Sequence, residues 1–383
     1  MRFIHTGDWH LGKSLIDWSL ADDQRFTLDA LLRLAEDLRP DAIVVAGDVF
    51  DRAVPPTAAV ERLNDVLGEL ALRLEIPVVM IAGNHDSPIR LQFLSGVIGR
   101  VGLHVVGEVG DEPKGVRIVG RDGVAIDFWP LAYTDPETAR GALGRSDIHS
   151  HEAVLAAHLE SIRERADADA RHVVVAHAFV TGAQPSESER PLTVGGSGQV
   201  SKDVFDGFDY VALGHLHRAQ EVSERVRYAG SLLKYSFAEA DHRKSVTVVD
   251  LAADGTVEVE EVELPSLHDL VRLRGSFAEL MDHPQAAACR DVYVEVLLTG
   301  GEAVLDPMER LRGVYPYVLS LKRDGSSLDV YSQDRPAVRG RSTRELFGDF
   351  FADVTGEALS EAQEDEVDAV LTSAAREARE VAS

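Results

Sequence analysis

The first third of the chain alternates short apolar runs with longer segments of helical spacing. Residues 2–5, 42–46 and 76–81 are short, apolar and followed by glycine-containing turns, a pattern that predicts buried strands. Between them, residues 22–38 and 57–70 repeat apolar side chains every three or four positions, which predicts amphipathic helices. Buried strands that alternate with helices indicate a layered α/β fold with parallel strands.

The pattern is less regular towards residue 265. Residues 172–176 and 209–213 predict two more buried strands, and shorter strands surround them. The segment between these two strands is long and rich in Gly, Ser and Pro. Loops of that length inside a domain are often functional, so we interpret this one as a flap near a site.

A change of character near Pro265 predicts further domains. Residues 266–334 alternate short strands and helices, which indicates a small α+β unit separate from the body, residues 1–265. Residues 335–341 are polar and contain Pro and Gly, as linkers often do. Residues 342–383 begin with the capping box Ser342-Thr343-Arg344-Glu345 and predict a pair of C-terminal helices.

The two C-terminal helices carry more apolar residues than a short helix can bury alone. They could pack back on the body of the chain. Because they follow a linker, we favour a docking element for a partner protein.

The composition is that of an ordinary globular protein, with 45% hydrophobic and 27% charged residues among 383. No apolar run approaches the roughly 18 residues needed to span a bilayer, and the start of the chain lacks a signal-peptide pattern. The single cysteine, Cys289, excludes an internal disulfide. These features predict a cytoplasmic protein with no membrane partner.

The net charge of −26 argues against a broad basic surface for nucleic acid. Either the substrate is not a polyanion, or bound cations and a partner subunit overcome the repulsion. Net charge bears on solubility and non-specific binding and leaves the fold undecided.

Five of the predicted strands end in residue types that bind metals. A single buried histidine is most often a satisfied core residue, and Asn, His and Asp are common in ordinary turns. Repetition at five strand ends favours a site, since open α/β sheets bind ligands at the carboxyl ends of their strands. The residues at these ends are Asp8, His10, Asp48, Asn84, His85, His177, His215 and His217.

This set of residues predicts a two-metal centre. Carboxylates and imidazoles gathered on one sheet edge are costly to bury, and divalent cations remove that cost. Imidazoles, carboxylates and one amide suit Mn, Fe or Zn better than Mg or Ca. Seven candidate ligands favour two ions, with Asp48 as the bridge because its turn lies between the others in sequence.

Two neighbouring ions would polarise a phosphoryl group and stabilise an in-line displacement. His85 is then left over, and it is the candidate general acid for the leaving alkoxide. Asp51 is the candidate for holding the His85 imidazole in the correct tautomer.

The motifs Asp-x-His, Gly-Asp-x-x-Asp, Gly-Asn-His-Asp, a lone His and Gly-His-x-His together resemble the calcineurin-like metallophosphoesterase family. Within that family the chain is similar to the SbcD-type subunits of bacterial DNA nucleases. The residues that carry this closer similarity lie at 47–51, 188–192, 214–217, 228–231 and 346–351.

The resemblance implies a metallophosphoesterase β-sandwich flanked by helices and a site that holds two manganese ions. Asp8, His10, Asp48 and His217 would hold one ion, and Asp48, Asn84, His177 and His215 the other. His85 would be the catalytic acid. Archaeal and eukaryotic relatives carry His where this chain has Asp51, which leaves the orienting group open.

The resemblance also implies partners. Residues 1–265 would be the nuclease domain, 266–334 a capping domain that contacts DNA, and 342–383 the dock for an SbcC-type ATPase. The family forms a homodimer through helices of the nuclease domain. It cuts double-strand ends and hairpins of DNA, as exonuclease and endonuclease, in repair and recombination.

Two other functions stay open. A stand-alone phosphoesterase for a small nucleotide or phosphoprotein would suit the acidic composition, but it needs neither a capping unit nor docking helices. A scaffold that binds DNA ends without cutting would not need the complete ligand set and His85.

Overall fold

The computed structural model describes residues 1–108, 110, 112–186, 188–189, 198–284, 286–300 and 304–323, and scattered positions between 347 and 370. The chain divides into two compact units, Met1–Arg323 and Asp324–Ser383. The predicted linker, most of the predicted C-terminal helices and residues 190–192 of the SbcD-like motif lie outside the described residues.

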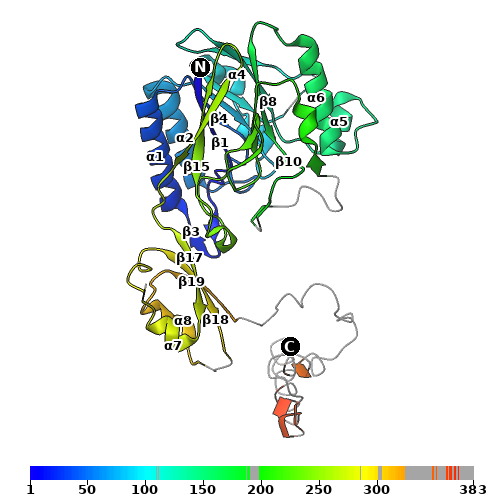
Figure 1. The fold of residues 1–383 in the computed structure, drawn as a ribbon. Helices are drawn as coiled ribbons and strands as arrows, with labels where there is room; N and C mark the ends of the chain where they lie inside the picture. Colours follow the sequence, from blue (N-terminus) through cyan, green and yellow to red (C-terminus); the bar gives the residue numbers. More distant parts are fainter. Residues whose placement is uncertain are drawn as a thin grey trace, which may run out of the picture. The chain divides into compact units, whose positions relative to one another are not determined.

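The body of the first unit contains two six-stranded sheets, each with parallel strands in its middle (Figure 1). In the first sheet the order is β16 (Val257–Glu263), β15 (Ser245–Leu251), β1 (Arg2–Thr6), β4 (Ala42–Val45), β5 (Val78–Ile81) and β6 (Leu103–Val106). In the second it is β13 (Gln220–Ser223), β14 (Val226–Tyr228), β12 (Tyr210–Gly214), β9 (Arg171–His177), β8 (Ala125–Leu131) and β7 (Val116–Val119).

The two sheets pack face to face around one apolar core. The ring of Phe3 in β1 meets the edges of Phe128 and Tyr210 in the second sheet, at centroid distances of 5.4 and 5.7 Å. The central strands β4, β5 and β12 are buried at every residue, which explains why they are continuous apolar runs.

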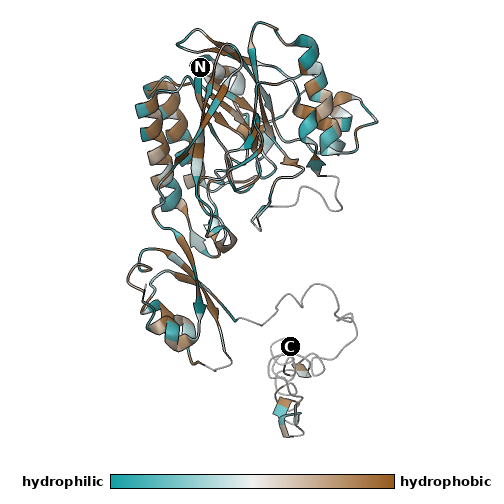
Figure 2. Ribbon diagram, viewed as in Figure 1, coloured by the Kyte–Doolittle hydropathy of each residue, from teal (hydrophilic) through white to brown (hydrophobic). Residues whose placement is uncertain are grey.

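Helices cover the outer faces of the sandwich (Figure 1). The helices α1 (Ala21–Leu38) and α2 (Thr57–Gly68) pack Leu31 and Leu63 against Ile43 of the first sheet. The helix α6 (His151–Arg165) packs against the second sheet. Figure 2 shows hydrophobic and hydrophilic residues alternating along α1 and α2, as the helical spacing predicts. The predicted layered α/β sandwich flanked by helices is confirmed.

A three-stranded sheet with its own core follows the body. The strands β17 (Leu270–Gly275), β18 (Tyr293–Leu298) and β19 (Val318–Arg323) are parallel, and α7 (Phe277–Met281) and α8 (Pro307–Arg312) accompany them. Leu273, Val296 and Leu311 are buried in its core. Strands and helices thus alternate between residues 270 and 323, within the compact unit Met1–Arg323.

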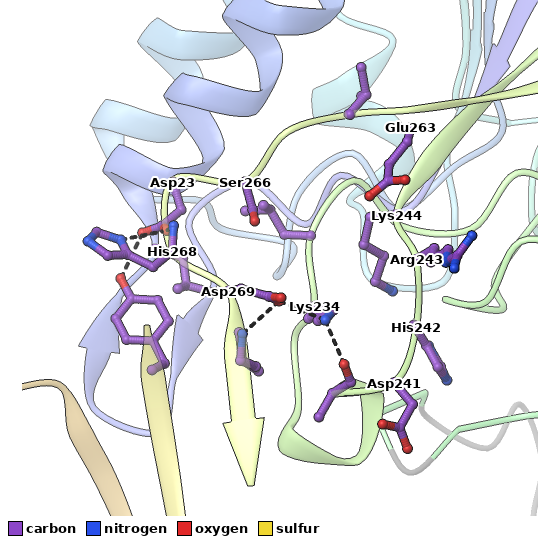
Figure 3. Close-up of a pocket in the computed structure, with 16 residues that line it drawn as sticks. Asp23, Lys234, Asp241, His242, Arg243, Lys244, Glu263, Ser266, His268 and Asp269 are labelled. Carbon is purple, nitrogen blue, oxygen red and sulfur yellow. Dashed lines mark hydrogen bonds and ion pairs between the residues drawn. The ribbon is translucent and has the colours of Figure 1, made fainter. Parts of the chain in front are cut away.

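Polar contacts around Asp23 join the small sheet to α1 (Figure 3). The buried Asp23 carboxylate accepts hydrogen bonds from the Tyr293 hydroxyl at 2.8 Å and from the main-chain N–H of His268 at 3.1 Å. Lys234 donates to Asp269 at 2.6 Å. A pocket of about 240 Å³ lies at this junction.

Among the helices that the structure describes, none is both long and apolar enough to cross a membrane.

The remaining elements are short. The short elements are β2 (Ser14–Leu15), β3 (Trp18–Ser19), η1 (Glu69–Arg73), α3 (Pro88–Leu91), α4 (Ser95–Ile98), η2 (Gly99–Val101), α5 (Pro136–Leu143), β10 (Phe179–Val180), β11 (Gln199–Val200), η3 (Lys202–Phe205) and η4 (Phe237–Glu239).

Candidate metal centre

The eight residues predicted from strand ends come together in one cluster. The first sheet supplies five of them from the ends of the neighbouring strands β1, β4 and β5, and the second sheet supplies three from β9 and β12. Parallel strands that lie side by side present their carboxyl ends at one edge, and the face-to-face packing brings the two edges together. The members are Asp8, His10, Asp48, Asn84 and His85 from the first sheet and His177, His215 and His217 from the second.

Four members of this cluster hold a left-handed backbone. The φ angles are 49° at Asp8, 43° at His10, 47° at Asp48 and 105° at His215. This conformation costs roughly 1–3 kcal/mol per non-glycine residue and persists where the surrounding structure imposes it, often at functional sites. The fold thus gives up stability to aim these side chains.

Two glycines of the motifs are needed because they leave space for neighbouring atoms, and not because of their backbone conformation. A Cβ on Gly83 would overlap Oδ1 of Asp48, and a Cβ on Gly214 would overlap the main-chain oxygen of Ala46. Neither glycine has a positive φ. The strand ends therefore approach one another closely only because these positions lack a side chain.

Asp48 occupies the middle of the cluster. Its Oδ2 lies 3.6 Å from Nε2 of His10, 3.5 Å from Nε2 of His177 and 4.0 Å from Nε2 of His85. Its Oδ1 accepts a hydrogen bond from the main-chain N–H of His85 at 2.9 Å. One carboxylate thus faces imidazoles of both sheets, as a ligand shared by two ions would.

The histidine tautomers test whether cations fit this cluster. Nδ1 of His177 lies 2.9 Å from the main-chain oxygen of Ala46, and Nδ1 of His217 lies 3.1 Å from Oε1 of Glu239. Since these oxygens only accept, both Nδ1 atoms carry the hydrogen and a neutral ring keeps its lone pair at Nε2.

The two lone pairs point at further ligand-type atoms. Nε2 of His217 lies 3.1 Å from Nε2 of His10, and Nε2 of His177 lies 2.9 Å from Oδ1 of Asn84. Two acceptors at that distance repel each other unless a proton or a cation lies between them. The donor set therefore fits two divalent cations, one beside His10 and His217 and one beside Asn84 and His177.

The charges of the cluster also fit bound cations. Burial raises the pKa of Asp8 to about 7. Burial alone would also raise the pKa of Asp48, but His177 and His10 outweigh it and hold that pKa well below its usual range. The two carboxylates overcome the opposing effect of burial and raise the pKa of His177 to about 9. A cation bound at Nε2 of His177 has to displace this proton, and it then replaces the charge that balances Asp48.

His85 lies at the edge of this set with one ring nitrogen fixed. Its Nδ1 donates to the main-chain oxygen of Asp51 at 2.8 Å, so Nε2 is the atom that can exchange a proton with a ligand. The main-chain oxygen of Asp51, and not its carboxylate, makes this contact. Asp51 thus contacts the His85 imidazole through its main-chain oxygen, whereas the residue type alone pointed to its carboxylate.

The Asp51 carboxylate has other neighbours. It accepts from Lys13 Nζ at 2.7 Å, and it lies 3.6 Å from Nδ1 of His10, a buried atom without a hydrogen-bond partner among the described residues. Ligand atoms of His10, Asp51 and His85 lie within 4.8 Å of one another, as do those of Asp8, Asp48 and His177. The Asp51 carboxylate therefore lies beside the His10 imidazole.

Residues outside the predicted ligand set also support the cluster. The Asp86 carboxylate accepts from the main-chain N–H groups of Val49, Phe50 and Gly83, which ties the β4 turn to the β5 turn. Glu239 accepts from His217, and Lys244 donates to Glu239. A charged residue in a polar turn is usually solvated, so the sequence carries no signal for the last two.

Two protein-family models match the chain. The model of the calcineurin-like phosphoesterases matches residues 1–219. A second model, SbcD_C, described as the type 5 capsule protein repressor C-terminal domain, matches residues 266–355.

Solved structures with a similar chain course are distant in sequence. The calcineurin-like phosphoesterase YfkN from Bacillus subtilis is 15% identical with a TM-score of 0.36, over 69% of this chain and 89% of its own. The protein TT1561 of Thermus thermophilus is 15% identical with a TM-score of 0.38, over 68% and 98%. A dimetal phosphatase from Danio rerio is 12% identical with a TM-score of 0.41, over 69% and 96%.

Proposed function

The chain belongs to the calcineurin-like phosphoesterase family as an SbcD-type member, and we propose that it is a manganese-dependent nuclease for DNA ends. Metal-dependent hydrolysis of phosphoesters is the chemistry of this family. The observation that carries the proposal is the convergence of eight ligand-type residues from five strands of two sheets.

In this proposal, one cation would be held by Asp8, His10, Asp48 and His217, and the other by Asp48, Asn84, His177 and His215. Two cations held there would supply Lewis acidity toward a phosphoryl group and would lower the pKa of water to a value useful near neutrality. The rigid strand ends and the strained turns hold the ligands in place, so little reorganisation is needed when a phosphodiester binds.

His85 supplies the proton in this proposal. Its Nδ1–H is held by the Asp51 oxygen, which aims Nε2 toward the side of Asp48 that faces the other imidazoles. A protonated Nε2 can donate to the alkoxide that leaves when the P–O bond breaks. The lost proton returns from solvent.

The DNA specificity rests on the second part of the chain. The SbcD_C match and the separate core of the three-stranded sheet support a capping domain at residues 266–334 beside a nuclease domain at 1–265. A linker at 335–341 and docking helices at 342–383 complete the division. Bound cations and a partner subunit would offset the net charge of −26, in the cytoplasm where we place the protein.

We expect the purified protein with Mn²⁺ to shorten linear duplex DNA and to open DNA hairpins, with no cleavage in EDTA. The same preparation is assayed on bis(p-nitrophenyl) phosphate as a small diester. Cleavage of the small diester without cleavage of DNA would instead support a small-substrate phosphoesterase. DNA binding with neither activity would support a scaffold.

A homodimer through the nuclease domain is part of the same proposal. Five large apolar residues of α3, α4, η2 and the turn between α3 and α4 are 48–72% exposed. Exposed apolar groups clustered in one short segment usually mark an interaction surface. This apolar segment follows the His85 turn directly, so pairing of two chains there would also support the site. The five residues are Ile89, Phe93, Leu94, Val97 and Val101.

Replacing Phe93 with Asp is expected to weaken the dimer about 30-fold or more, because a buried interface aromatic commonly contributes about 2 kcal/mol or more. Sedimentation equilibrium over a dilution series measures the dissociation constant. Leu305→Asp is the matched control, since Leu305 is 81% exposed between β18 and α8 and lies outside the apolar segment. An unchanged dimer in Phe93→Asp would contradict this interface.

The C-terminal residues are proposed to dock an SbcC-type ATPase. The SbcD_C match reaches into the first predicted helix, and the main-chain N–H and hydroxyl of Ser360 both bond to Oε1 of Gln363, as at the start of a capped helix. Deleting residues 342–383 is expected to leave manganese-dependent cleavage intact and to abolish stimulation by the ATPase and ATP. Undiminished binding of the ATPase to the truncated chain would contradict the proposal.

A further inference from the structure

A buried ion pair lies directly behind His217. Glu239 ends η4 and is fully buried, and Lys244 precedes β15 and is 8% exposed. Their side chains meet at 2.6 Å, between Lys244 Nζ and Glu239 Oε2. Because desolvation offsets most of the attraction in such a pair, it contributes little net stability. The pair is therefore better explained by a role other than stabilising the fold.

Lys244 uses all three of its N–H groups. Besides Glu239, it donates to the main-chain oxygen of His217 at 2.7 Å and to the Ser231 hydroxyl at 2.8 Å. An ammonium group has three donors and no acceptor, so its geometry here is completely determined. Lys244 thus holds both the backbone of His217 and the carboxylate that contacts the His217 ring.

Glu239 selects the His217 tautomer. Its Oε1 lies 3.1 Å from Nδ1 of His217, and a carboxylate can only accept, so Nδ1 carries the hydrogen. The Ser188 hydroxyl lies 2.9 Å from the same Nδ1, but a hydroxyl can donate or accept and therefore selects neither tautomer. With the hydrogen on Nδ1, the lone pair of Nε2 faces His10.

The charge on Glu239 is stabilised where it is needed. Lys244 Nζ lies 2.6 Å from Oε2 of Glu239, and Nδ1 of His217 lies 3.1 Å from Oε1. An ammonium group can only donate, so Glu239 meets it as an acceptor and directs its other oxygen to His217.

We propose that Glu239 and Lys244 are positioning residues that hold His217 in its Nδ1–H tautomer and aim Nε2 at the cation position shared with His10. The inference rests on the proposed two-cation function and deepens it, because it names the groups that make one of the two positions a good ligand site. Partners of this kind behind a metal-binding histidine typically change metal affinity by about 10- to 100-fold.

Glu239→Gln tests the inference with an almost unchanged shape. Lys244 still needs an acceptor, so the amide oxygen of the glutamine turns to Lys244 and its NH₂ group faces Nδ1 of His217. This arrangement favours the Nε2–H tautomer, whose Nε2 has no lone pair for a cation. We expect one of the two Mn²⁺ dissociation constants to rise by about 10- to 100-fold and the other to stay unchanged.

Two measurements test the expected change of tautomer and of Mn²⁺ affinity. Long-range ¹H–¹⁵N spectra of the histidine side chains in metal-free protein report the tautomer, with His217 assigned by its absence in His217→Gln. Titration calorimetry with Mn²⁺ reports the two affinities. The metal-free spectra are expected to show Nδ1–H in the wild type and Nε2–H in Glu239→Gln.

The double variant Glu239→Gln with Lys244→Met separates positioning from general damage. Without the ammonium the amide is free to rotate, its oxygen can face Nδ1, and the Nδ1–H tautomer and most of the lost affinity are expected to return. Glu295→Gln is the matched control, because Glu295 is a carboxylate of the small sheet, 2% exposed and paired with Arg272 and Lys322. It is expected to change neither the tautomer nor the affinities.

Unchanged tautomer and affinities in Glu239→Gln would overturn the inference. So would a double variant that binds Mn²⁺ no better than Glu239→Gln. If the wild type binds fewer than two ions, the proposed two-cation function fails, and the metal-free spectra still decide whether Glu239 and Lys244 set the tautomer.

Discussion

Replacing His85 with alanine is expected to lower cleavage of DNA by about 10²- to 10⁴-fold while two divalent ions stay bound. The rate falls because the leaving alkoxide loses its proton donor. The ions stay because His85 supports Asp48 through its main-chain N–H, at 2.9 Å from Oδ1, and alanine keeps that group. Cleavage rates and the metal content of the dialysed variant are measured side by side.

The leaving group provides the control for this prediction. A p-nitrophenyl ester leaves as a weakly basic phenolate that needs little protonation, so His85→Ala is expected to lose far less activity on it than on DNA. An equal loss on both substrates would remove His85 as the acid, and so would retained cleavage of DNA.

The location of the site could be predicted from the sequence because it depends on local pattern. An apolar run ends, a glycine follows, and Asp8, Asp48, Asn84 or His215 comes next. Parallel strands present such ends at a common edge, so a list of strand ends is already close to a list of neighbours. The helices α1 and α2 were predictable for a similar reason, since their apolar spacing needs no long-range information.

The division of the strands between two sheets could not be predicted in this way. Val45 and Ala176 end runs of the same apolar character, yet β4 lies in the first sheet and β9 in the second. Strands buried on both faces read alike whichever sheet contains them. His177 faces Asn84 across the sandwich because the two sheets pack together. The spacing of apolar residues in the sequence gives no information on this contact.

The atoms that orient the histidines could not be predicted from the sequence either. Asp51 was correctly placed near His85, but its main-chain oxygen makes the contact and its carboxylate lies beside Lys13. Side-chain identity gives no information on which main-chain groups become acceptors. Glu239 and Lys244 lie in a polar stretch that suggests a solvated turn, and only the closed sandwich shows them buried.

Replacing Asp48 with alanine is expected to reduce the bound divalent ions from two to none. Its Oδ2 is the one carboxylate oxygen described within 3.6 Å of Nε2 of both His10 and His177, so its removal takes a ligand from both positions at once. Metal analysis measures the stoichiometry. Thermal unfolding with and without Mn²⁺ gives a second measurement, because a ligand at about 100 times its dissociation constant stabilises the fold by about 2.7 kcal/mol.

Asp209→Ala is the matched control for Asp48→Ala. Asp209 is also a buried carboxylate, but it lies at the amino end of β12, away from the cluster, and accepts from the main-chain N–H of His172 at 2.7 Å. It is expected to lower the unfolding temperature and to keep both ions and the Mn²⁺-dependent stabilisation. Asp48→Ala is expected to lose that stabilisation. If Asp48→Ala kept one ion, Asp48 would be a ligand of a single position, and with both ions kept it would be no ligand at all.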